Sequence, residues 1–542
     1  MGAVLVGTAL VGVVLANLPS APGAALPPPH YVEEAAAAGV DQVYDGDFDF
    51  SVGGGLAVFD CNDDGKPDLY VAGGSRPAAL YRNAGPVGGA LRFSPVHDPA
   101  TDLTGVNGAY PIDIDGDGRV DLAVLRFGEN VLLRGLGDCR FERANDAWSF
   151  DGGAAWTTAF SATWEGTNAL PTLAVGNYLT TTEAADGTSS CVDNELFRPG
   201  PTGLVYAAPS ALAPGYCALS MLFSDWDRSG RRDLRVSNDR HYYDQSTGQE
   251  QLWRMSPGEA PRLYTDADGW VAVQIEGMGI ASYDLTNDGY PEVFLTSQAD
   301  NRLQTLTSGP SQPTYRDIGL KRGVNATVPY AGGDPLPSTA WHPEFQDVNN
   351  DGLIDLFISK GNIDRVPDYA QKDPSNLLIG ALDGTFSEGA PAAGIVDFGK
   401  ARGAALVDFN LDGLLDLVEV DYGGPLKLFR NVGSGDVAKP ASMGNWLALR
   451  VTEPGPNHEA IGAWLEVRVG DSAMQRELTV GGGHVSGQSG WAHFGLGSAG
   501  AADVRVQWPD GETGPWVHVP ANEFGLIDRS AAGVRPWLPP TN

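Results

Sequence analysis

Basic residues are scarce in this sequence. Its 542 residues include 35 Lys and Arg against 68 Asp and Glu, so the formal net charge is -33. Nucleic-acid binding needs clustered Lys and Arg to neutralise phosphates, and this balance argues against such a partner. Long apolar runs are missing as well, because no segment after the N-terminus has eighteen consecutive apolar residues. We therefore expect no membrane-spanning helix in the body of the chain.

The N-terminal segment has no Lys or Arg before Lys66. Residues 4–15 form an apolar run that is too short to span a bilayer, and small residues and prolines follow as far as Pro29. This pattern predicts a signal peptide over residues 1–25, although its usual basic start is missing. An ordinary buried strand or helix is the alternative. A signal peptide would make the protein an exported one, either secreted or held at the cell surface.

Cysteine is rare too, with only four residues, an even number that suits disulfides in an exported protein. Four cysteines allow three pairings. Pairing of segments that lie close in the chain favours Cys61 with Cys139 and Cys191 with Cys217. Four free buried thiols are the alternative.

Glycine and proline, by contrast, are abundant, with 71 and 38 residues, and the hydrophobic fraction of 42% is enough for packed cores. Such a composition indicates many turns and short strands. An internal repeat accounts for much of the length: six acidic loops, each between two short apolar segments, share one pattern. The loops begin at Asp60, Asp113, Asp225, Asp284, Asp347 and Asp408.

One interval between loops is about twice as long as the others, and a degenerate copy without the ligand carboxylates lies within it at residues 164–175. Seven units of about four strands predict an all-β fold, a seven-bladed β-propeller over residues 31–435. Residues 31–40 repeat an element that otherwise ends a unit, and no copy follows the last unit. We therefore expect the ring to close by pairing its two ends. An open solenoid of β units is the alternative.

Oxygen-bearing side chains occupy positions 1, 3, 5 and 9 of every loop, and position 6 is Gly. This spacing wraps a short turn around a hard cation, and Ca²⁺ suits it better than Mg²⁺ because a flexible oxygen cage tolerates six to eight ligands. The loops are not EF-hands, because position 12 is apolar except at Glu419. The predicted calcium ligands are Asp60, Asn62, Asp64, Asp68, Asp113, Asp115, Asp117, Asp121, Asp225, Asp227, Ser229, Asp233, Asp284, Thr286, Asp288, Glu292, Asp347, Asn349, Asp351, Asp355, Asp408, Asn410, Asp412 and Asp416.

The calcium ions are expected to be structural, because a catalytic metal would occur once and not in every unit. The loops that contain Ser229, Thr286 and Glu292 depart most from the pattern. Asx-turns that merely cap hairpins are the alternative, but they would not need three or four acidic residues each time.

The repeat, an apolar strand followed by Asp-x-Asx-x-Asp-Gly-x-x-Asp and Leu-x-Val, resembles the FG-GAP/VCBS-type propeller repeat and is similar to the calcium blades of integrin α chains. Segments 445–451, 460–464, 481–489, 493–497 and 506–511 resemble the ASPIC/UnbV domain. The tandem of the two looks like the cartilage acidic protein family. The resemblance implies an extracellular calcium-binding protein that acts through its surfaces on protein or carbohydrate ligands, with no reaction common to its members.

Apolar alternation also indicates a small β domain over residues 445–530. Its Gly481–Gly483 run and His484 are candidate lining of a ligand pocket. A tight turn beside a hydrogen-bonded histidine is the alternative.

A ligand site at one mouth of the ring is a further prediction. The residues five and six beyond each ninth loop position end a strand in every unit, and they vary in type. Their mixture of charged and aromatic side chains suits polar or sugar-like ligands, with a solvated rim as the alternative. The candidate ligand-binding residues are Arg126, Tyr178, Asn238, Asp239, Lys360, Asp421 and Tyr422.

The principal expectation is a calcium-binding protein that mediates protein or glycan binding or adhesion. The alternative is an enzyme with its active site at the same mouth, where Asp239, His241 or Tyr242 would act as acid or base with help from Ca²⁺. No Gly-x-Ser-x-Gly, His-Glu-x-x-His or Walker sequence is present, so no catalytic residue is assigned beyond this alternative.

Overall fold

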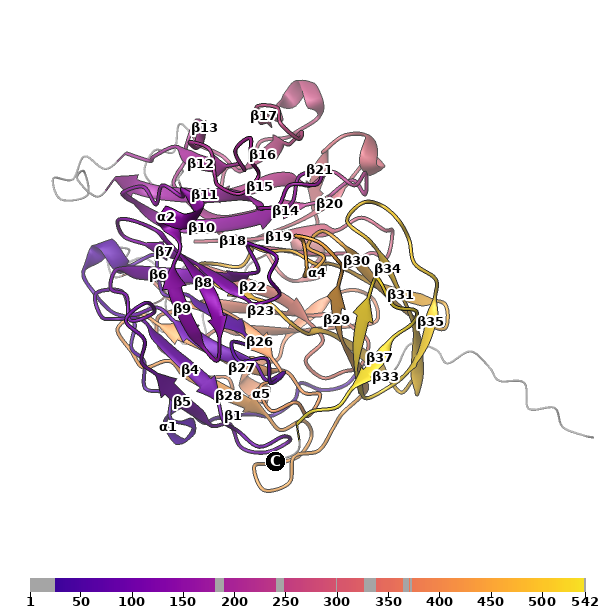
Figure 1. Ribbon diagram of the computed structural model, residues 1–542. Helices are drawn as coiled ribbons and strands as arrows, with labels where there is room; N and C mark the ends of the chain where they lie inside the picture. The colour runs from indigo at the N-terminus through magenta and orange to yellow at the C-terminus, as the bar shows by residue number, and fades with distance from the viewer. Residues whose placement is uncertain are drawn as a thin grey trace, which may run out of the picture.

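The structure, a computed structural model, describes residues 25–180, 190–239, 248–298, 300–325, 338–363, 370 and 373–540. Strands dominate it, which confirms the all-β prediction (Figure 1). The α-helices of the described residues are single turns at the ends of sheets, and the 3-10 helices are as short. They are α1 (Ala35–Ala38), α2 (Asn145–Trp148), α4 (Gly319–Arg322), α5 (Ala390–Ala393), η1 (Phe48–Phe50), η2 (Asp266–Asp268) and η3 (Gly309–Ser311).

Seven antiparallel sheets follow one another along the described part of residues 31–431. The first four are β2 (Leu56–Phe59), β3 (Asp68–Val71), β4 (Ala79–Asn83) and β5 (Phe93–Val96); β6 (Val106–Ile112), β7 (Asp121–Arg126), β8 (Val131–Gly137) and β9 (Arg140–Arg143); β10 (Ala155–Thr163), β11 (Thr172–Thr180), β12 (Asn194–Phe197) and β13 (Ser210–Leu212); and β14 (Ala218–Ser224), β15 (Asp233–Asn238), β16 (Gln251–Arg254) and β17 (Arg262–Leu263).

The remaining three sheets follow the same order. They are β18 (Gly277–Tyr283), β19 (Glu292–Ser297), β20 (Arg302–Leu306) and β21 (Tyr315–Asp317); β22 (Ala340–Gln346), β23 (Asp355–Lys360), β24 (Asn376–Gly380) and β25 (Phe386–Glu388); and β26 (Ala401–Val407), β27 (Asp416–Asp421) and β28 (Lys427–Asn431) with β1 (Tyr31–Glu33).

The sheets form a closed ring. The first strand of each sheet contacts the first strand of the next, from β2 through β6, β10, β14, β18 and β22 to β26, and β26 contacts β2. The two ends of the ring are joined within one sheet, where β1 pairs antiparallel to β28 with Tyr31 opposite Asn431. This confirms the predicted pairing of the chain ends. The degenerate unit at residues 164–175 also forms a strand pair, β10 with β11.

Both faces of each sheet are covered by neighbouring sheets, so the inner strands are buried along nearly their whole length. In the first sheet, every residue of β2 and β3 is buried, and Val58 and Leu69 belong to a core that extends into the adjoining sheets. Because no face is left to solvent, these strands lack the apolar–polar alternation of a one-sided sheet. The apolar pairs on either side of each acidic loop are therefore core residues.

The C-terminal region is a small β-sandwich (Figure 1). Its strands are β29 (Asn445–Thr452), β30 (Trp464–Val469), β31 (Ser472–Glu477), β33 (Ala492–Gly497), β34 (Ala501–Gln507), β35 (Val517–Pro520), β36 (Glu523–Asp528) and β37 (Arg535–Trp537). One sheet has the order β33-β29-β36-β37 and the other β31-β30-β34-β35, and Leu447, Leu465 and Val504 lie in the core between them.

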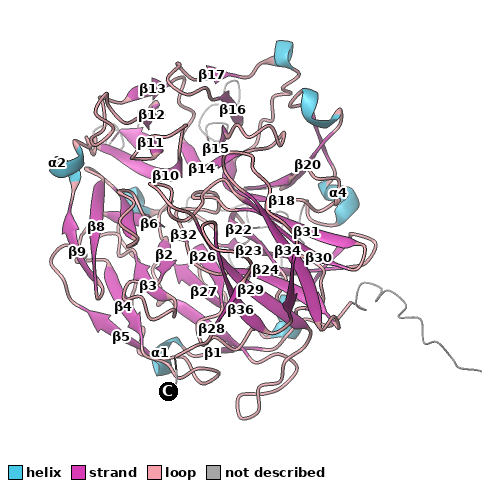
Figure 2. Ribbon diagram, turned by 45° about the vertical axis from the view of Figure 1, so that its right-hand side comes forward, coloured by secondary structure: helices cyan, strands magenta, loops and turns pink. Residues whose placement is uncertain are grey.

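Residues 480–489 leave this sandwich and run along the axis of the ring; we call them the axial segment. They form β-bridges to the inner strands, Val480 to β10, Gly481 to β14, Gly483 to β18 and Ser486 to β6. Strand β32 (Gly487–Gln488) then pairs parallel to β2, in the middle of the ring (Figure 2). The ring is therefore filled along its axis by backbone from the second domain.

Candidate functional site

Each acidic loop joins the first and second strands of a sheet, and its backbone turns inward. The residue at position 4 has a left-handed φ in all six loops, for example 59° at Asp63 and 57° at Leu411, and the Gly at position 6 has a φ of 81° to 91°. Residues other than Asn and Asp rarely adopt a left-handed φ, and Gly does so without strain. The invariant Gly of the repeat is therefore required by the turn.

The position 1 carboxylate organises the turn. In the first loop, Asp60 accepts hydrogen bonds from the backbone N–H of Asp64 at 3.2 Å and of Gly65 at 2.7 Å. The loops at Asp113, Asp284, Asp347 and Asp408 repeat both bonds, with distances of 2.7 to 3.2 Å. The predicted ligands of each loop are thus brought together around one short turn.

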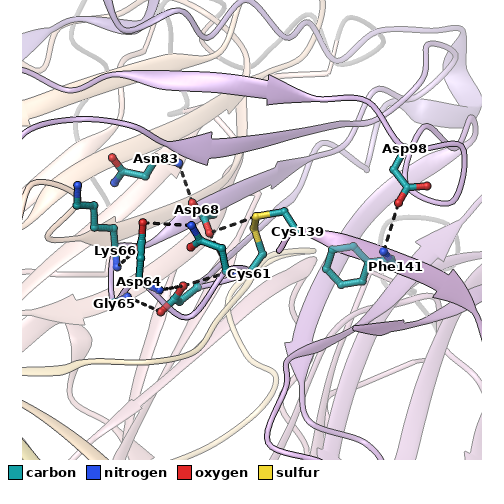
Figure 3. Close-up of a disulfide and its surroundings, with 11 residues drawn as sticks. Cys61, Asp64, Gly65, Lys66, Asp68, Asn83, Asp98, Cys139 and Phe141 are labelled. Carbon is teal, nitrogen blue, oxygen red and sulfur yellow. Dashed lines mark hydrogen bonds between the residues drawn. A yellow bond between two sulfur atoms is a disulfide. The ribbon is translucent and has the colours of Figure 1, made fainter. Parts of the chain in front are cut away.

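The residue at position 9 has a role that the spacing alone did not reveal. Asp68 accepts from the N–H of Cys61 in its own loop at 2.8 Å and from the N–H of Asn83 on the third strand at 2.7 Å (Figure 3). Asp121, Asp355 and Asp416 make the same two kinds of bond. These carboxylates tie three strands of a sheet to the loop, whether or not they also bind an ion.

Position 3 is different, because its oxygen lacks a partner in several loops. Asn62 Oδ1, Asp115 Oδ1 and Asn410 Oδ1 are buried and have no hydrogen-bond donor among the described residues. Leaving a buried acceptor unpaired costs about 1–3 kcal/mol. In each of these loops, a cation held inside the turn would bind the unpaired oxygen. The residues present therefore fit the predicted ion.

Burial makes the negative charge of these loops unfavourable without a counter-ion. Desolvation raises the pKa of Asp68 to about 8 and that of Asp113 to about 7. It also raises the pKa of Asp284 to about 6, and that of Asp408 well above its ordinary value. Neighbouring loop carboxylates add to the increase in each case. A bound divalent cation would neutralise these carboxylates, which would otherwise bind protons.

The loops are not equal as cation sites. Asp113, Asp115 and Asp117 each place a carboxylate oxygen within 4.8 Å of the others, and no other three predicted carboxylate ligands in the described part of the chain meet this condition. In the fourth sheet, Arg231 donates to Asp233 at 2.9 Å and to Asp227 at 3.2 Å, so a guanidinium already neutralises that loop in part.

In the degenerate unit an arginine pairs with the one acidic residue of the loop, Glu165. Arg198 Nη2 donates to Glu165 Oε1 at 2.8 Å and Arg198 Nε donates to Glu165 Oε2 at 2.6 Å. The Thr172 hydroxyl, at position 9, also donates to Glu165 at 2.9 Å. This unit is therefore held by an internal ion pair.

Both favoured disulfides are present. Cys61 pairs with Cys139, which ties the first acidic loop to the second sheet (Figure 3), and Cys191 pairs with Cys217. The alternative of four free thiols is wrong.

The candidate residues at the mouth are mostly buried. Tyr178, Asn238, Asp239, Lys360 and Asp421 are each at most 2% exposed. The Tyr178 hydroxyl donates to Asp239 at 2.6 Å, and Lys360 pairs with Asp373.

Arg126 and Tyr422 are half-buried. The Tyr422 hydroxyl donates to Gly46 at 2.6 Å, and the rings of Phe48 and Phe50 pack on Trp156 and Phe127, so residues 46–50 lie over part of the mouth. His241 and Tyr242 lie outside the described residues. The ligand site and the catalytic alternative at this mouth stay predictions.

A cavity of about 260 Å³ lies on the opposite side, between the acidic-loop face of the ring and the C-terminal domain. The two domains meet around it: Glu459 accepts from the Asp113 N–H at 3.1 Å, and Glu477 from the Asp225 N–H at 2.9 Å. Inner-strand residues His342 and Glu344, and Arg476 of the C-terminal domain, line the cavity. Sequence analysis missed these three residues, which no spacing pattern connects.

The Gly481–Gly483 run does line this cavity, as the sequence suggested, but His484 lies deeper in the ring axis. Its Nε2 is 2.9 Å from the Val52 carbonyl oxygen, and its side chain is fully buried beside Trp341. Its Nδ1 is 3.3 Å from the Leu219 carbonyl oxygen, and burial lowers the pKa of His484 to about 3, so the ring is neutral near pH 7. His484 is therefore a buried, hydrogen-bonded histidine, as in the alternative to a pocket-lining role.

Two sequence families match the chain in separate places. The family described as ASPIC and UnbV matches residues 453–534, and the FG-GAP-like repeat matches residues 60–124. Cartilage acidic protein 1 of Mus musculus is 25% identical over 496 residues, which cover 84% of this chain and 70% of that protein. Cartilage acidic protein 1 of Homo sapiens is 24% identical over 498 residues, covering 84% and 69%. The chain is a homologue of cartilage acidic protein 1.

A solved structure of BBS1N in complex with ARL6DN is also similar, over 75% of this chain and 98% of its own, with 10% identity and a TM-score of 0.42. Among the described residues, no helix is long and apolar enough to cross a membrane. The two disulfides and the relationship to cartilage acidic protein are consistent with an extracellular protein.

Proposed function

We propose that the chain is an extracellular binding protein whose propeller is held together by calcium ions in its acidic loops. The observation that carries the proposal is the set of buried, unpaired oxygens at position 3, Asn62 Oδ1, Asp115 Oδ1 and Asn410 Oδ1. Each belongs to a turn that already gathers carboxylates at positions 1, 5 and 9.

The calcium ions would act as structural cross-links. Each loop joins the inner strand of a sheet to the second strand, and position 9 bonds to the third, so one ion stabilises a whole sheet. The loops also face the C-terminal domain, through contacts such as that between Asp113 and Glu459. Ion binding in the second loop would therefore also support the contact between domains.

A binding or adhesion role, with a protein or a glycan as partner, agrees with the homology to cartilage acidic protein and with the net charge of -33. The exposed surface of the ring and the sandwich would carry this role, because the polar residues of the mouth are largely engaged with one another.

Chelation tests the calcium part of the proposal. Excess EDTA should lower the Tm of the full chain, and Ca²⁺ should restore it, because a ligand at 100 times its Kd adds about 2.7 kcal/mol per site. Calorimetric titration should give one ion for each intact loop. Asp117→Ala should remove one of them, whereas Asn168→Ala, at the equivalent position of the degenerate unit, should remove none. A Tm that EDTA leaves unchanged would refute the calcium proposal.

A further inference from the structure

The cavity between the two domains contains a guanidinium with unused hydrogen-bond donors. Arg476, on β31, donates through Nη2 to the Phe345 carbonyl at 3.3 Å and to Gln346 Oε1 at 2.9 Å. Its Nε is buried without an acceptor, and Nη1 has no hydrogen-bond partner among the described residues. Within the described part of the chain, no carboxylate oxygen lies within 4.0 Å of it.

Two other arginines of the same domain, Arg468 and Arg529, are paired, whereas Arg450, which also lines the cavity, forms no ion pair with the described residues. Arg468 contacts Asp503 at 3.0 Å, and Arg529 contacts Glu453 at 2.8 Å. Burial lowers the pKa of Arg476, and Glu344 and the Tyr283 hydroxyl only partly offset this effect. The Arg476 guanidinium is therefore half-buried, close to the rings of Tyr283 and Phe494 and without a direct counter-ion, an arrangement that a bound anion would complete.

The nearest acidic residue of the ring wall is not available to Arg476. Glu344 accepts hydrogen bonds from Gln346 at 2.8 Å, from Gln488 at 2.7 Å and from the Leu406 N–H at 2.9 Å. Both of its oxygens are thus occupied. Gln346 stands between the two charges, since it donates to Glu344 and accepts from Arg476. Glu344 serves to hold the polar wall in place.

The rest of the lining is mixed: Tyr110, Leu222, Ile280 and Trp491 give it an apolar part, and Asp408, Glu459 and Glu477 give it an acidic part. Its volume of about 260 Å³ is just below the ~300–1,000 Å³ usual for small-molecule pockets, so only a small organic ligand fits. We propose that this cavity binds a small monocarboxylate, with the carboxylate on Arg476 and an apolar body against the apolar part of the lining. This site borders the acidic-loop face, where Asp408 also lines the cavity, and lies on the opposite side of the ring from the mouth.

Titration of the full chain in calcium-containing buffer with benzoate, phenylacetate and hexanoate tests the proposal, with benzyl alcohol as the uncharged match for benzoate. At least one carboxylate should bind with a 1:1 ratio, and benzyl alcohol should bind at least tenfold more weakly than benzoate. Arg476→Gln should weaken carboxylate binding at least tenfold. Arg468→Gln, a matched arginine on the outer surface of the same domain, should leave it unchanged.

A second variant keeps the test independent of the arginine. Ser282, on β18, lines the cavity and is partly accessible, so Ser282→Phe would fill space while Arg476 stays in place. This variant should abolish binding and keep the calcium-dependent Tm, which shows that the fold is intact. The proposal is overturned if none of the three carboxylates binds, if benzyl alcohol binds as well as benzoate, or if binding survives in both Arg476→Gln and Ser282→Phe.

Discussion

The axial segment depends on inner-strand positions that have no side chain, and Gly108 is one of the tightest. Gly108 lies in β6, and a Cβ added there would be 1.9 Å from the Val485 carbonyl oxygen and 2.8 Å from Val485 Cβ. Carbon atoms in contact need about 3.5 Å. In a Gly108→Ala variant, the axial segment must therefore move by roughly 1.5 Å or the strand must bend.

We expect Gly108→Ala to destabilise the protein by about 1–3 kcal/mol, the usual cost of overpacking. Unfolding entropy of about 2.1 cal/mol/K per residue converts this into a Tm decrease of about 1–3 °C for a chain of this length. Hydrogen exchange should become faster in peptides that cover residues 480–489. Differential scanning calorimetry and exchange mass spectrometry measure the two effects.

The control is Gly500→Ala, because a Cβ at Gly500 meets nothing within 4 Å. If Gly108→Ala matches this control both in Tm and in the exchange of residues 480–489, the axial segment does not depend on the bare backbone of β6. The reasoning that the ring axis was shaped for the segment would then be refuted.

Two other outcomes follow from buried charges. Arg198→Met should lower the free energy of unfolding in urea by about 2–4 kcal/mol, because the Glu165 carboxylate loses its bidentate partner. Added Ca²⁺ should not restore this stability, whereas a double variant that also carries Glu165→Gln should recover part of it. A double variant with no recovery would contradict the ion-pair account. His484 has a pKa of about 3 in the fold against 6.5 in the unfolded chain, so its contribution is complete above pH 6.5 and is lost as the pH falls towards 3. At pH 5 this loss is about 2 kcal/mol. In saturating Ca²⁺, the unfolding free energy of the His484→Gln variant should therefore fall less steeply between pH 7 and 5 than that of the original chain. Equal slopes for the two proteins would mean that His484 does not titrate as its burial requires.

Much of the fold could be predicted from local chemistry. The Gly at position 6 marks a left-handed turn, and residues 31–33 close the ring because they repeat an element that the last unit lacks. The spacing singled out position 9 as a calcium ligand, which stays a prediction, but its bonds to the third strand depend on register, which sequence spacing does not specify.

The mouth and the axis were harder to predict, because they depend on contacts between distant segments. Tyr178 and Asp239 look like ligand-binding residues when each unit is considered alone, yet they hydrogen bond to each other across two sheets. Similarly, Gly55 and Gly108 look like ordinary strand or turn glycines until the Val485 carbonyl is placed 1.8 and 1.9 Å from their missing Cβ atoms. Arg476 and Glu344 come together only when the two domains meet.

The filling of the ring by residues 480–489 has a consequence for biosynthesis. All strands of the seven sheets emerge from the ribosome before this segment does, because the last of them ends at Asn431. Until it does, the inner strands lack the bridges that Val480, Gly481, Gly483 and Ser486 make to them in the folded protein. These axial contacts therefore become available last in synthesis, and a chain cut short before Val480 would lack all of them.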